Sequence, residues 1–296
     1  MVGPTASGKS DLALDIVGET FEIVSADSVQ VYRYMDIGSC KPEKKDLERI
    51  NHYLIDIVDP DYQFTAGEFC NRALSACKEI DSKNKIPLIA GGTGLYVSSF
   101  FGGISEIPEL DSDIKSILSK EAETRGLDVL FDELVRVDPE YALKIHRNDR
   151  QRIIRGLEVF RGTGRPFSDF HKKEKVYSGD DSFIIGLYLE RDELNRKIEN
   201  RVDEMIRRGL VEEVEKLRSM GYSPGLNSMK SIGYSEINEY IDNKFSLNEA
   251  IEKIKTNTKK YAKKQMTWFK RMKEVLWFDN KEKERIKENI KNWLKQ

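Results

Sequence analysis

The sequence has few cysteines and no long apolar run. None of the three cysteines is in C-x-x-C spacing, which argues against a disulfide framework or a zinc site, so Cys40, Cys70 and Cys77 are expected to be free thiols. No apolar run approaches the roughly 18 residues that a membrane helix needs, so no membrane partner is predicted. No basic and apolar leader opens the chain, and we therefore expect a cytoplasmic protein.

An excess of charge of one sign is also missing. Lys and Arg number 49 against 51 Asp and Glu, a net charge of −2, which argues against a protein that coats nucleic acid indiscriminately but allows a local basic surface. With 39% hydrophobic and 34% charged residues, the 296-residue chain is typical of a globular protein with one large domain or two unequal ones.

A phosphate-binding loop lies near the amino terminus. The pattern G-x-x-x-x-G-K-[ST] is formed by Gly3, Pro4, Thr5, Ala6, Ser7, Gly8, Lys9 and Ser10. In such a loop the backbone N–H groups and a helix amino terminus cradle phosphate, the lysine adds a charge, and the serine hydroxyl can bind Mg²⁺. A chance glycine-rich turn is the alternative. Only Met1 and Val2 precede the loop, so either the chain starts late or the strand that normally stands there is a stub.

Short apolar segments alternate with helical ones along the first part of the chain. Strands are predicted at 21–25, 52–57, 86–90 and 183–189, and helices at 11–17, 65–81, 192–208 and 210–220. This order predicts an α/β fold, a P-loop NTPase-like parallel sheet flanked by helices. Ligands of such sheets gather at the carboxyl ends of the strands.

A helical block interrupts this alternation. Helical spacing starts near Ile114 and continues to about Phe170, before the strand that ends at Leu189. We therefore predict a core made of residues 1–112 and 183–296, which includes the C-terminal helices, and an all-helical domain inserted at 113–182.

Two polar residues follow predicted strands. Asp27 could act as a general base or bind Mg²⁺, and a capping role is its alternative. Thr93 lies in a Gly-Gly-Thr-Gly turn that lets a ligand approach the backbone closely, although it could be an ordinary turn threonine. Because the strand before Thr93 runs into glycines instead of a metal-binding acid, transfer of a group carried on phosphates is favoured over plain ATP hydrolysis.

Two segments are candidates for nucleic-acid binding. Residues 146–155 contain four arginines and Gln151, which suit phosphates and base edges, while a charged helix face is the alternative. A capping box at Ser246–Glu249 opens a long helix, in which residues 253–273 carry nine basic residues and no acidic one. A solvated helix face is the alternative for this basic segment. Tyr261, Gln265 and Trp268 fall on the apolar stripe of the helix, and Tyr261 and Trp268 are predicted to be core residues, with stacking on bases as their alternative.

Together these motifs resemble the tRNA dimethylallyltransferases, the tRNA isopentenyltransferase family, in its bacterial form. The resemblance rests on ordered motifs that run from Gly3 to about Phe278. They are G-P-T-A-S-G-K-S (3–10), S-A-D-S-V-Q-V-Y (25–32), M-D-I-G-S-C-K-P (35–42), G-G-T-G-L-Y (91–96), D-P-E-Y-A (138–142), H-R-N-D-R-Q-R-I-I-R-G-L-E-V (146–159), T-G-R-P-F-S (163–168), R-G-L-V-E-E-V (208–214), S-I-G-Y-S-E (231–236) and Y-A-K-K-Q-M-T-W-F (261–269).

The resemblance implies an enzyme that moves a dimethylallyl group from dimethylallyl diphosphate to the exocyclic amine of the adenine on the 3′ side of the anticodon. The tRNAs would be those that read codons beginning with U. Asp27, Thr93 and Arg201 match the catalytic positions, residues 3–10 would hold the diphosphate, and Ser10 would bind the Mg²⁺ cofactor. A monomer is expected.

The tRNA anticodon stem-loop is the implied partner, and the target adenine would be flipped into the site. The resemblance and the basic helix together predict tRNA contacts at Asp27, Ser28, Val29, Gln30, Gln151, Arg152, Ile153, Ile154, Arg155, Lys259, Lys260 and Lys263.

Three rival functions remain open on the sequence. An adenylate isopentenyltransferase has a similar core but prenylates a free nucleotide, which needs neither the helical block nor the basic helix. A small-metabolite or nucleoside kinase could use the same loop. A tRNA-binding factor could carry a vestigial one.

Overall fold

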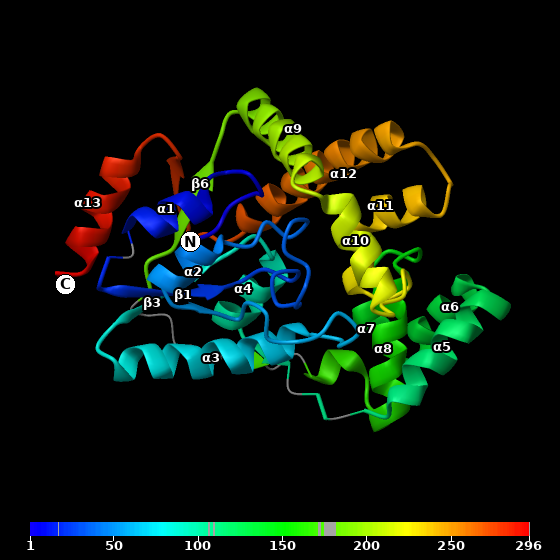
Figure 1. Ribbon diagram of the computed structural model, residues 1–296. Coiled ribbons are helices and arrows are strands. Elements are labelled where there is room, and N and C mark those ends of the chain that lie inside the picture. Colours follow the sequence, from blue (N-terminus) through cyan, green and yellow to red (C-terminus); the bar gives the residue numbers. More distant parts are fainter. Residues whose placement is uncertain (17, 106, 109, 171–172, 175–181, 296) are drawn as a thin grey trace. The chain divides into compact units, whose positions relative to one another are not determined.

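The computed structural model describes residues 1–296 except 17, 106, 109, 171–172, 175–181 and 296 (Figure 1). It divides into two compact units. Unit 1 comprises Met1–Phe101 and Tyr177–Gln296, and unit 2 comprises Gly102–Val176, so unit 2 is inserted in the sequence of unit 1. The α/β class predicted from the alternating pattern is confirmed, because unit 1 combines parallel strands with helices.

Unit 1 is built on two groups of parallel strands. β1 (Phe21–Ser25) pairs with β2 (His52–Tyr53) on one side and with β3 (Ile86–Ala90) on the other. The second group pairs β6 (Ile185–Tyr188) with β7 (Leu276–Asp279).

Val2 links the two groups of strands. It forms parallel bridges to Gly91, just after β3, and to Gly186 in β6. Its N–H donates to the Ile185 carbonyl at 2.8 Å, and its carbonyl accepts from the Leu187 N–H at 2.9 Å. Val2 is thus paired on both sides, and it places the phosphate-binding loop at the carboxyl edge of these strands.

Helices make up most of the rest of unit 1, and Figure 1 shows α9 and α12 side by side. In chain order the helices are α1 (Lys9–Ile16), α2 (Lys44–Arg49), α3 (Ala66–Ser82), α4 (Gly94–Gly102), α9 (Arg191–Arg207), α10 (Leu210–Ser219), the 3-10 helix Ser228–Lys230, α11 (Tyr234–Ile241), α12 (Leu247–Phe269) and α13 (Lys283–Trp293).

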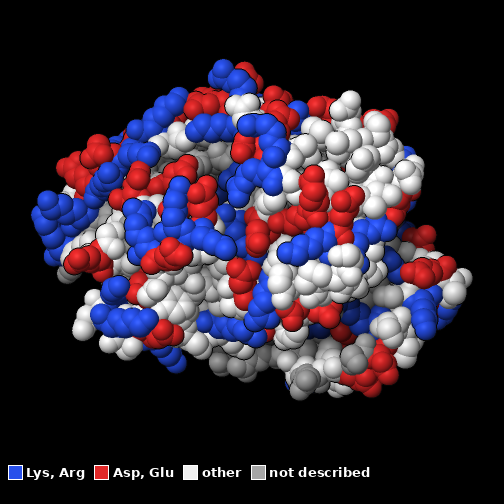
Figure 2. All heavy atoms as spheres, in the orientation of Figure 1, with Lys and Arg blue, Asp and Glu red and all other residues white. Residues whose placement is uncertain are grey.

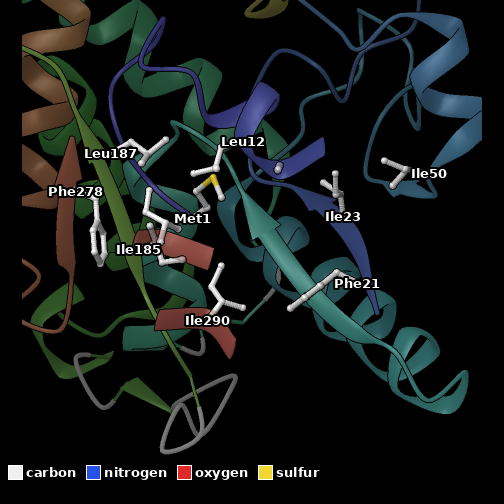
Figure 3. Close-up of a cluster of buried hydrophobic side chains, with 11 residues drawn as sticks. Met1, Leu12, Phe21, Ile23, Ile50, Ile185, Leu187, Phe278 and Ile290 are labelled. Carbon is white, nitrogen blue, oxygen red and sulfur yellow. The ribbon is translucent and has the colours of Figure 1, made fainter. Parts of the chain in front are cut away.

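The core of unit 1 fills the space between the strands and α1 and α13. Figure 3 shows Met1, Leu12, Phe21, Ile185 and Leu187 among its side chains, which come from segments far apart in the sequence. At about 1.5–3 kcal/mol for each buried large side chain, this packing holds the strand ends where the loop needs them.

Unit 2 contains a separate helical core. Leu118, Leu130, Leu134, Ile153 and Leu157 are its fully buried members. The elements of unit 2 are β4 (Ile104–Ser105), α5 (Ser112–Thr124), α6 (Leu127–Val137), α7 (Pro139–Ala142), α8 (Arg150–Thr163), the 3-10 helix Phe167–Phe170 and β5 (Lys173–Glu174), with β4 and β5 antiparallel.

Two predicted strands are shorter than expected. The segment 52–57 pairs only at β2, because Leu54 and Asp56 adopt positive φ angles of 64° and 55° that end the extended backbone. The segment 183–189 is a strand only where β7 lies opposite it. Within the described residues, no helix is both long and apolar enough to cross a membrane.

Candidate active site

The phosphate-binding loop forms a nest of backbone N–H groups at the start of α1. Gly3 and Gly8 have φ angles of 146° and 88°, and Ala6 also lies in the left-handed region at 62°. A Cβ on Gly3 would come within 2.6 Å of the Leu187 carbonyl oxygen, so glycine is needed there on two grounds. Within the described residues, the N–H groups of Ala6, Gly8, Lys9 and Ser10 make no hydrogen bond.

Lys9 bends back over this nest. Its Nζ donates to the carbonyl oxygens of Gly3 at 3.0 Å and Pro4 at 2.8 Å. Burial and the charge of Arg201 lower the pKa of Lys9 to about 7, although Asp27 opposes the shift. An anion in the nest would favour the charged form of Lys9, so the site is electrostatically prepared for phosphate.

Asp27 is held by one oxygen only. Its Oδ1 accepts from the N–H groups of Val29 at 2.8 Å and Gln30 at 3.3 Å. The capping role considered as an alternative is therefore real, but it uses a single oxygen. No described residue hydrogen-bonds Oδ2, and Asp27 lines the same cavity as Lys9. The carboxylate can thus be anchored and still take up a proton.

Thr93 lies beside Asp27 because the ends of β1 and β3 approach closely. A Cβ on Gly91 would meet the Ala26 carbonyl oxygen at 2.1 Å, so only glycine allows this approach. The Thr93 N–H donates to that carbonyl at 3.2 Å, and its Oγ1 accepts from the Ser28 N–H at 3.0 Å. Thr93 and Asp27 are therefore neighbours across two adjacent strand ends.

Helices α9 and α12 close the site from the other side. On α9, the Nη1 atom of Arg201 donates a hydrogen bond to Thr5 Oγ1 at 3.0 Å. From α12, Gln265 accepts from the Thr5 N–H and donates to the Gly92 carbonyl, both at 2.8 Å. Arg201, unremarkable by spacing alone, thus lies beside the phosphate-binding loop.

Tyr261 is a site residue that the sequence analysis assigned to the core. It was predicted to be core, yet it is 36% exposed and lines the cavity that contains Asp27. Burial of the hydroxyl and the charge of Asp27 raise the pKa of Tyr261 to about 12, while hydrogen bonds to Thr93 and Gln265 oppose the shift. The sequence held one signal that Tyr261 and Gln265 belong to the site, namely that both are polar residues on an apolar helix stripe.

Two cavities with shared lining residues give these residues room for substrates. One of about 380 Å³ is lined by the loop, Lys9, Asp27 and Arg201. Another of about 310 Å³ shares Asp27 and Arg201 with it and continues toward Ile254. Both volumes lie within the range of ordinary ligand sites. Asp27 borders both, so it can face a leaving group in one and a nucleophile in the other.

The residues predicted to contact tRNA differ in their accessibility. Ser28, Val29 and Gln30 line the cavities with Asp27. Gln151 and Arg152 are exposed and Arg155 is half-buried on α8.

The prediction for α8 needs a correction at two positions. Ile153 and Ile154 are 0% and 7% exposed in the core of unit 2. Their side chains therefore cannot face RNA, because the apolar face of α8 is used to pack its own unit.

The lysines of α12 also differ from one another. Lys255 pairs with Asp203 at 2.9 Å, and Lys259 pairs with Glu199, both acids lying on α9. Lys260 and Lys263 are exposed and form no ion pair within the described residues. Figure 2 likewise shows positive and negative side chains interspersed over the face in view. The charge available to a polyanion is thus smaller than the sequence suggests.

The cysteines and the metal-ligating side chains are dispersed. Cys40, Cys70 and Cys77 are free, and burial raises the pKa of the Cys70 and Cys77 thiols to about 12. No cluster of three or more His, Cys, Asp or Glu side chains occurs among the residues that the structure describes.

Comparison with known proteins matches the chain to one family. The family model described as IPP transferase matches residues 30–272. A protein named tRNA dimethylallyltransferase from Caldanaerobacter subterraneus is 45% identical over 303 residues, which cover 99% of this chain and 96% of that protein. The protein of the same name from Acetivibrio thermocellus is 42% identical over 99% of this chain and 96% of its own length.

Solved structures agree with this match. The full-length tRNA isopentenylpyrophosphate transferase from Bacillus halodurans superposes with a TM-score of 0.72 at 36% identity, covering 99% of this chain and 95% of that one. A eukaryotic dimethylallyltransferase described as acting on tRNA superposes with a TM-score of 0.80 at 28% identity, over 94% of this chain and 72% of that one.

Proposed function

Because the chain belongs to the IPP transferase family, we propose that it transfers a dimethylallyl group from dimethylallyl diphosphate to the N6 amine of an adenine in tRNA and releases diphosphate. The family consists of enzymes, prenyltransferases, and this chain is one of them. The adenine is the one on the 3′ side of the anticodon, position 37, in tRNAs that read UNN codons. One observation carries the proposal: Asp27 borders the same cavity as the phosphate-binding loop.

The diphosphate lies in the nest at residues 3–10. The N–H groups of Ala6, Gly8 and Lys9, which bond to none of the described residues, and the amino terminus of α1 suit its oxygens. The Ser7 hydroxyl is buried and has no hydrogen-bond partner within the described residues, a defect of about 1–3 kcal/mol that a phosphate oxygen could relieve. Arg201 supplies a second fixed charge close to the loop.

Ser10 is the residue that would hold Mg²⁺. Its side chain is exposed in the wall of the cavity, where it can offer a hydroxyl oxygen, a ligand type that this metal accepts. With no cluster of three acidic or histidine side chains among the described residues, the other ligands would be diphosphate oxygens and water. When bound, Mg²⁺ would neutralise charge on the leaving group.

The reaction is a substitution at carbon. The amine nitrogen forms a bond to C1 of the dimethylallyl group, and the C1–oxygen bond breaks with its electron pair leaving on diphosphate. The proton lost by the amine passes to the free oxygen of Asp27, whose other oxygen is anchored. Lys9 and Arg201 stabilise the growing negative charge on the leaving group, while Thr93 orients the reacting groups beside Asp27.

The tRNA is held outside this chemistry. Ser28, Val29 and Gln30 surround the flipped adenine. Gln151, Arg152 and Arg155 of unit 2 contact the anticodon stem-loop, and Lys260 and Lys263 add phosphate contacts. Arg152 and Arg155 are paired with Asp149 and Glu158, so these ion pairs would rearrange on binding.

A labelling experiment separates the candidate functions. The full chain is incubated with Mg²⁺, radiolabelled dimethylallyl diphosphate, and either unmodified tRNA or AMP. Label in tRNA at A37 is the expected result. Label only in AMP would identify an adenylate prenyltransferase, and tRNA binding with no transfer would leave a binding factor. In a parallel incubation with labelled ATP, phosphate moved from ATP would identify a kinase.

The lysines of α12 provide a separate test of the tRNA contact. Replacing Lys260 and Lys263 by alanine should reduce the salt slope of tRNA binding by about 1 for each lost phosphate contact. Lys259→Ala is the matched control, because Lys259 is already neutralised by Glu199 and should change the slope less. An unaltered slope in the double variant would place the tRNA elsewhere.

A further inference from the structure

Gln265 is the one polar side chain buried in α12 within the described residues. It is 5% exposed, among Ile254, Ala262 and Phe269 on the inward face of that helix. A buried amide is unfavourable unless its hydrogen bonds are made, so its partners define its role. An apolar residue would fill this position in the stripe at lower cost if packing were its only task.

Besides its hydrogen bond with Tyr261, Gln265 makes two hydrogen bonds that join two turns distant in sequence. Its oxygen accepts from the Thr5 N–H in the phosphate-binding loop, and its Nε2 donates to the Gly92 carbonyl beside Thr93, each at 2.8 Å. The orientation of the amide is dictated by its partners, because an N–H needs an acceptor and a carbonyl needs a donor. One side chain thus sets the separation of the loop and the turn.

Thr5 is held from both sides as a result. Gln265 holds its N–H, and an Arg201 Nη1 donates to its hydroxyl at 3.0 Å. The Thr5 N–H is therefore directed away from the nest, and the neighbouring N–H groups are left for phosphate. The contact is also tight, since a Cβ on Gly92 would lie 2.4 Å from Gln265 Nε2.

We propose that Gln265 is a positioning residue that holds the phosphate-binding loop in register with the turn that carries Thr93. The proposal rests on the proposed prenyl transfer, because the loop would carry the leaving group while Thr93 and Asp27 would face the attacking amine. A shift of the loop changes the distance between them. Misplacement by about 1 Å can lower turnover by about 10²-fold, so Gln265 acts mainly on kcat.

The test compares two variants that break the same contact from opposite sides. Gln265→Met keeps the length of the side chain but removes the hydrogen bonds to Thr5 and Gly92, together with that to Tyr261. Gly92→Ala pushes the amide away without changing it. Each should lower kcat by about 10- to 100-fold at saturating substrates, while the affinity for inorganic diphosphate measured by calorimetry falls only severalfold. The double variant should lose about as much as either single one, because both remove one interaction.

Asn238→Ala is the matched control for a purely structural amide. Asn238 is 3% exposed in α11 and donates to the Met229 carbonyl at 3.4 Å, so its loss should lower the melting temperature and leave kcat per folded molecule unchanged. Gln265→Glu is a second variant in case Gln265→Met does not fold. It keeps the acceptor for Thr5 but cannot donate to Gly92 when ionised, and it should also lose kcat.

The outcomes separate this inference from the proposed function. If wild type neither binds diphosphate nor prenylates tRNA, the proposed function is wrong. If wild type does both and the Gln265 and Gly92 variants keep kcat within about twofold, or if their losses multiply in the double variant, Gln265 is not a positioning residue.

Discussion

The two ends of strand β1 carry carboxylates that are used in opposite ways. Glu22, near the start of β1, is 2% exposed, and both its oxygens are occupied. Asn51 and Lys85 donate to one oxygen at 2.9 Å, and Tyr53 donates to the other at 2.9 Å, with Lys83 at 3.5 Å. Asp27, just past the end of the strand, lines a cavity, and among the described residues only its Oδ1 accepts hydrogen bonds.

This difference distinguishes a carboxylate that stabilises the fold from one that can take part in a reaction. A carboxylate whose hydrogen bonds are all made inside the protein is fixed as an anion and has no capacity left for a substrate. A carboxylate with one anchored oxygen is oriented and can still accept a proton. The strand supplies the same rigid support to both, so the neighbouring residues decide which role each carboxylate takes.

The largest effect is expected at Asp27, the carboxylate that lines the cavity. Asp27→Asn should lower turnover in tRNA prenylation by about 10²–10⁴-fold, because an amide cannot take the proton from the amine. Binding of tRNA and of diphosphate should survive, since the phosphate-binding loop is unchanged. Rates from single-turnover assays check this, and undiminished turnover would remove Asp27 from the role of general base.

Lys9 should show a smaller effect that is linked to pH. With its pKa at about 7, because burial and Arg201 lower it, Lys9 is mostly neutral at pH 8. Bound diphosphate should raise that pKa, so binding at pH 8 should take up a proton. Lys9→Met should bind inorganic diphosphate with Mg²⁺ about 10- to 100-fold more weakly, as expected for a lost charge-assisted hydrogen bond.

Calorimetry in two buffers of different ionisation enthalpy measures the proton uptake. The difference between wild type and Lys9→Met removes the protons that the ligand itself exchanges. An equal uptake by both proteins would show that Lys9 keeps its charge in the empty site.

A substitution at Glu22 should change the stability of the fold and leave the activity unchanged. Glu22→Gln should lower the free energy of unfolding by about 1–3 kcal/mol, because it leaves hydrogen bonds to Lys83 and Lys85 weakened. Urea unfolding gives this value, and turnover per folded molecule should equal that of wild type. A loss of turnover at Glu22 comparable with that at Asp27 would abolish the distinction between the two ends.

The smallest expected effect is the pH dependence of the stability that Glu22 contributes. Burial would raise the pKa of Glu22, but hydrogen bonds from Lys85, Asn51 and Tyr53 and the charge of Lys83 outweigh it and lower the pKa to about 2 from the usual 4.5. A lowered pKa means that the carboxylate stabilises the fold above about pH 4.5 and loses this effect as the pH falls toward 2. The stability difference between wild type and Glu22→Gln should shrink across that window, and a constant difference would contradict it.

Much of the fold follows from local patterns. β1 and β3 have the predicted bounds, and the capping box at Ser246 is confirmed by its hydrogen bonds with Glu249. Alternation and capping depend on residues close in sequence, so they can be read without knowing the neighbours. The strand predicted at 52–57 was too long, because an apolar pattern does not reveal the positive φ angles at Leu54 and Asp56.

Local sequence patterns predicted fewer of the site residues than of the strands and helices. The loop, Asp27 and Thr93 were found because they follow strands whose ends must share one edge. Gln265 and Tyr261 were assigned to an apolar stripe, since helical periodicity shows which face points inward but not what it meets there. Ile153 and Ile154 were taken with their charged neighbours, although the same periodicity puts them in the core of unit 2.

The sequence by itself determined the phosphate-binding loop, the order of strands and helices, and the family, because each depends on residue types at fixed local spacing. Only the tertiary structure decided three outcomes among the described residues. Both oxygens of Glu22 accept hydrogen bonds while Asp27 uses one, Lys259 pairs with Glu199 while Lys260 has no ion pair, and Gln265 joins Thr5 to Gly92. These outcomes depend on side chains that meet across as many as 260 residues, and hydrogen bonds and charges act through distance in space.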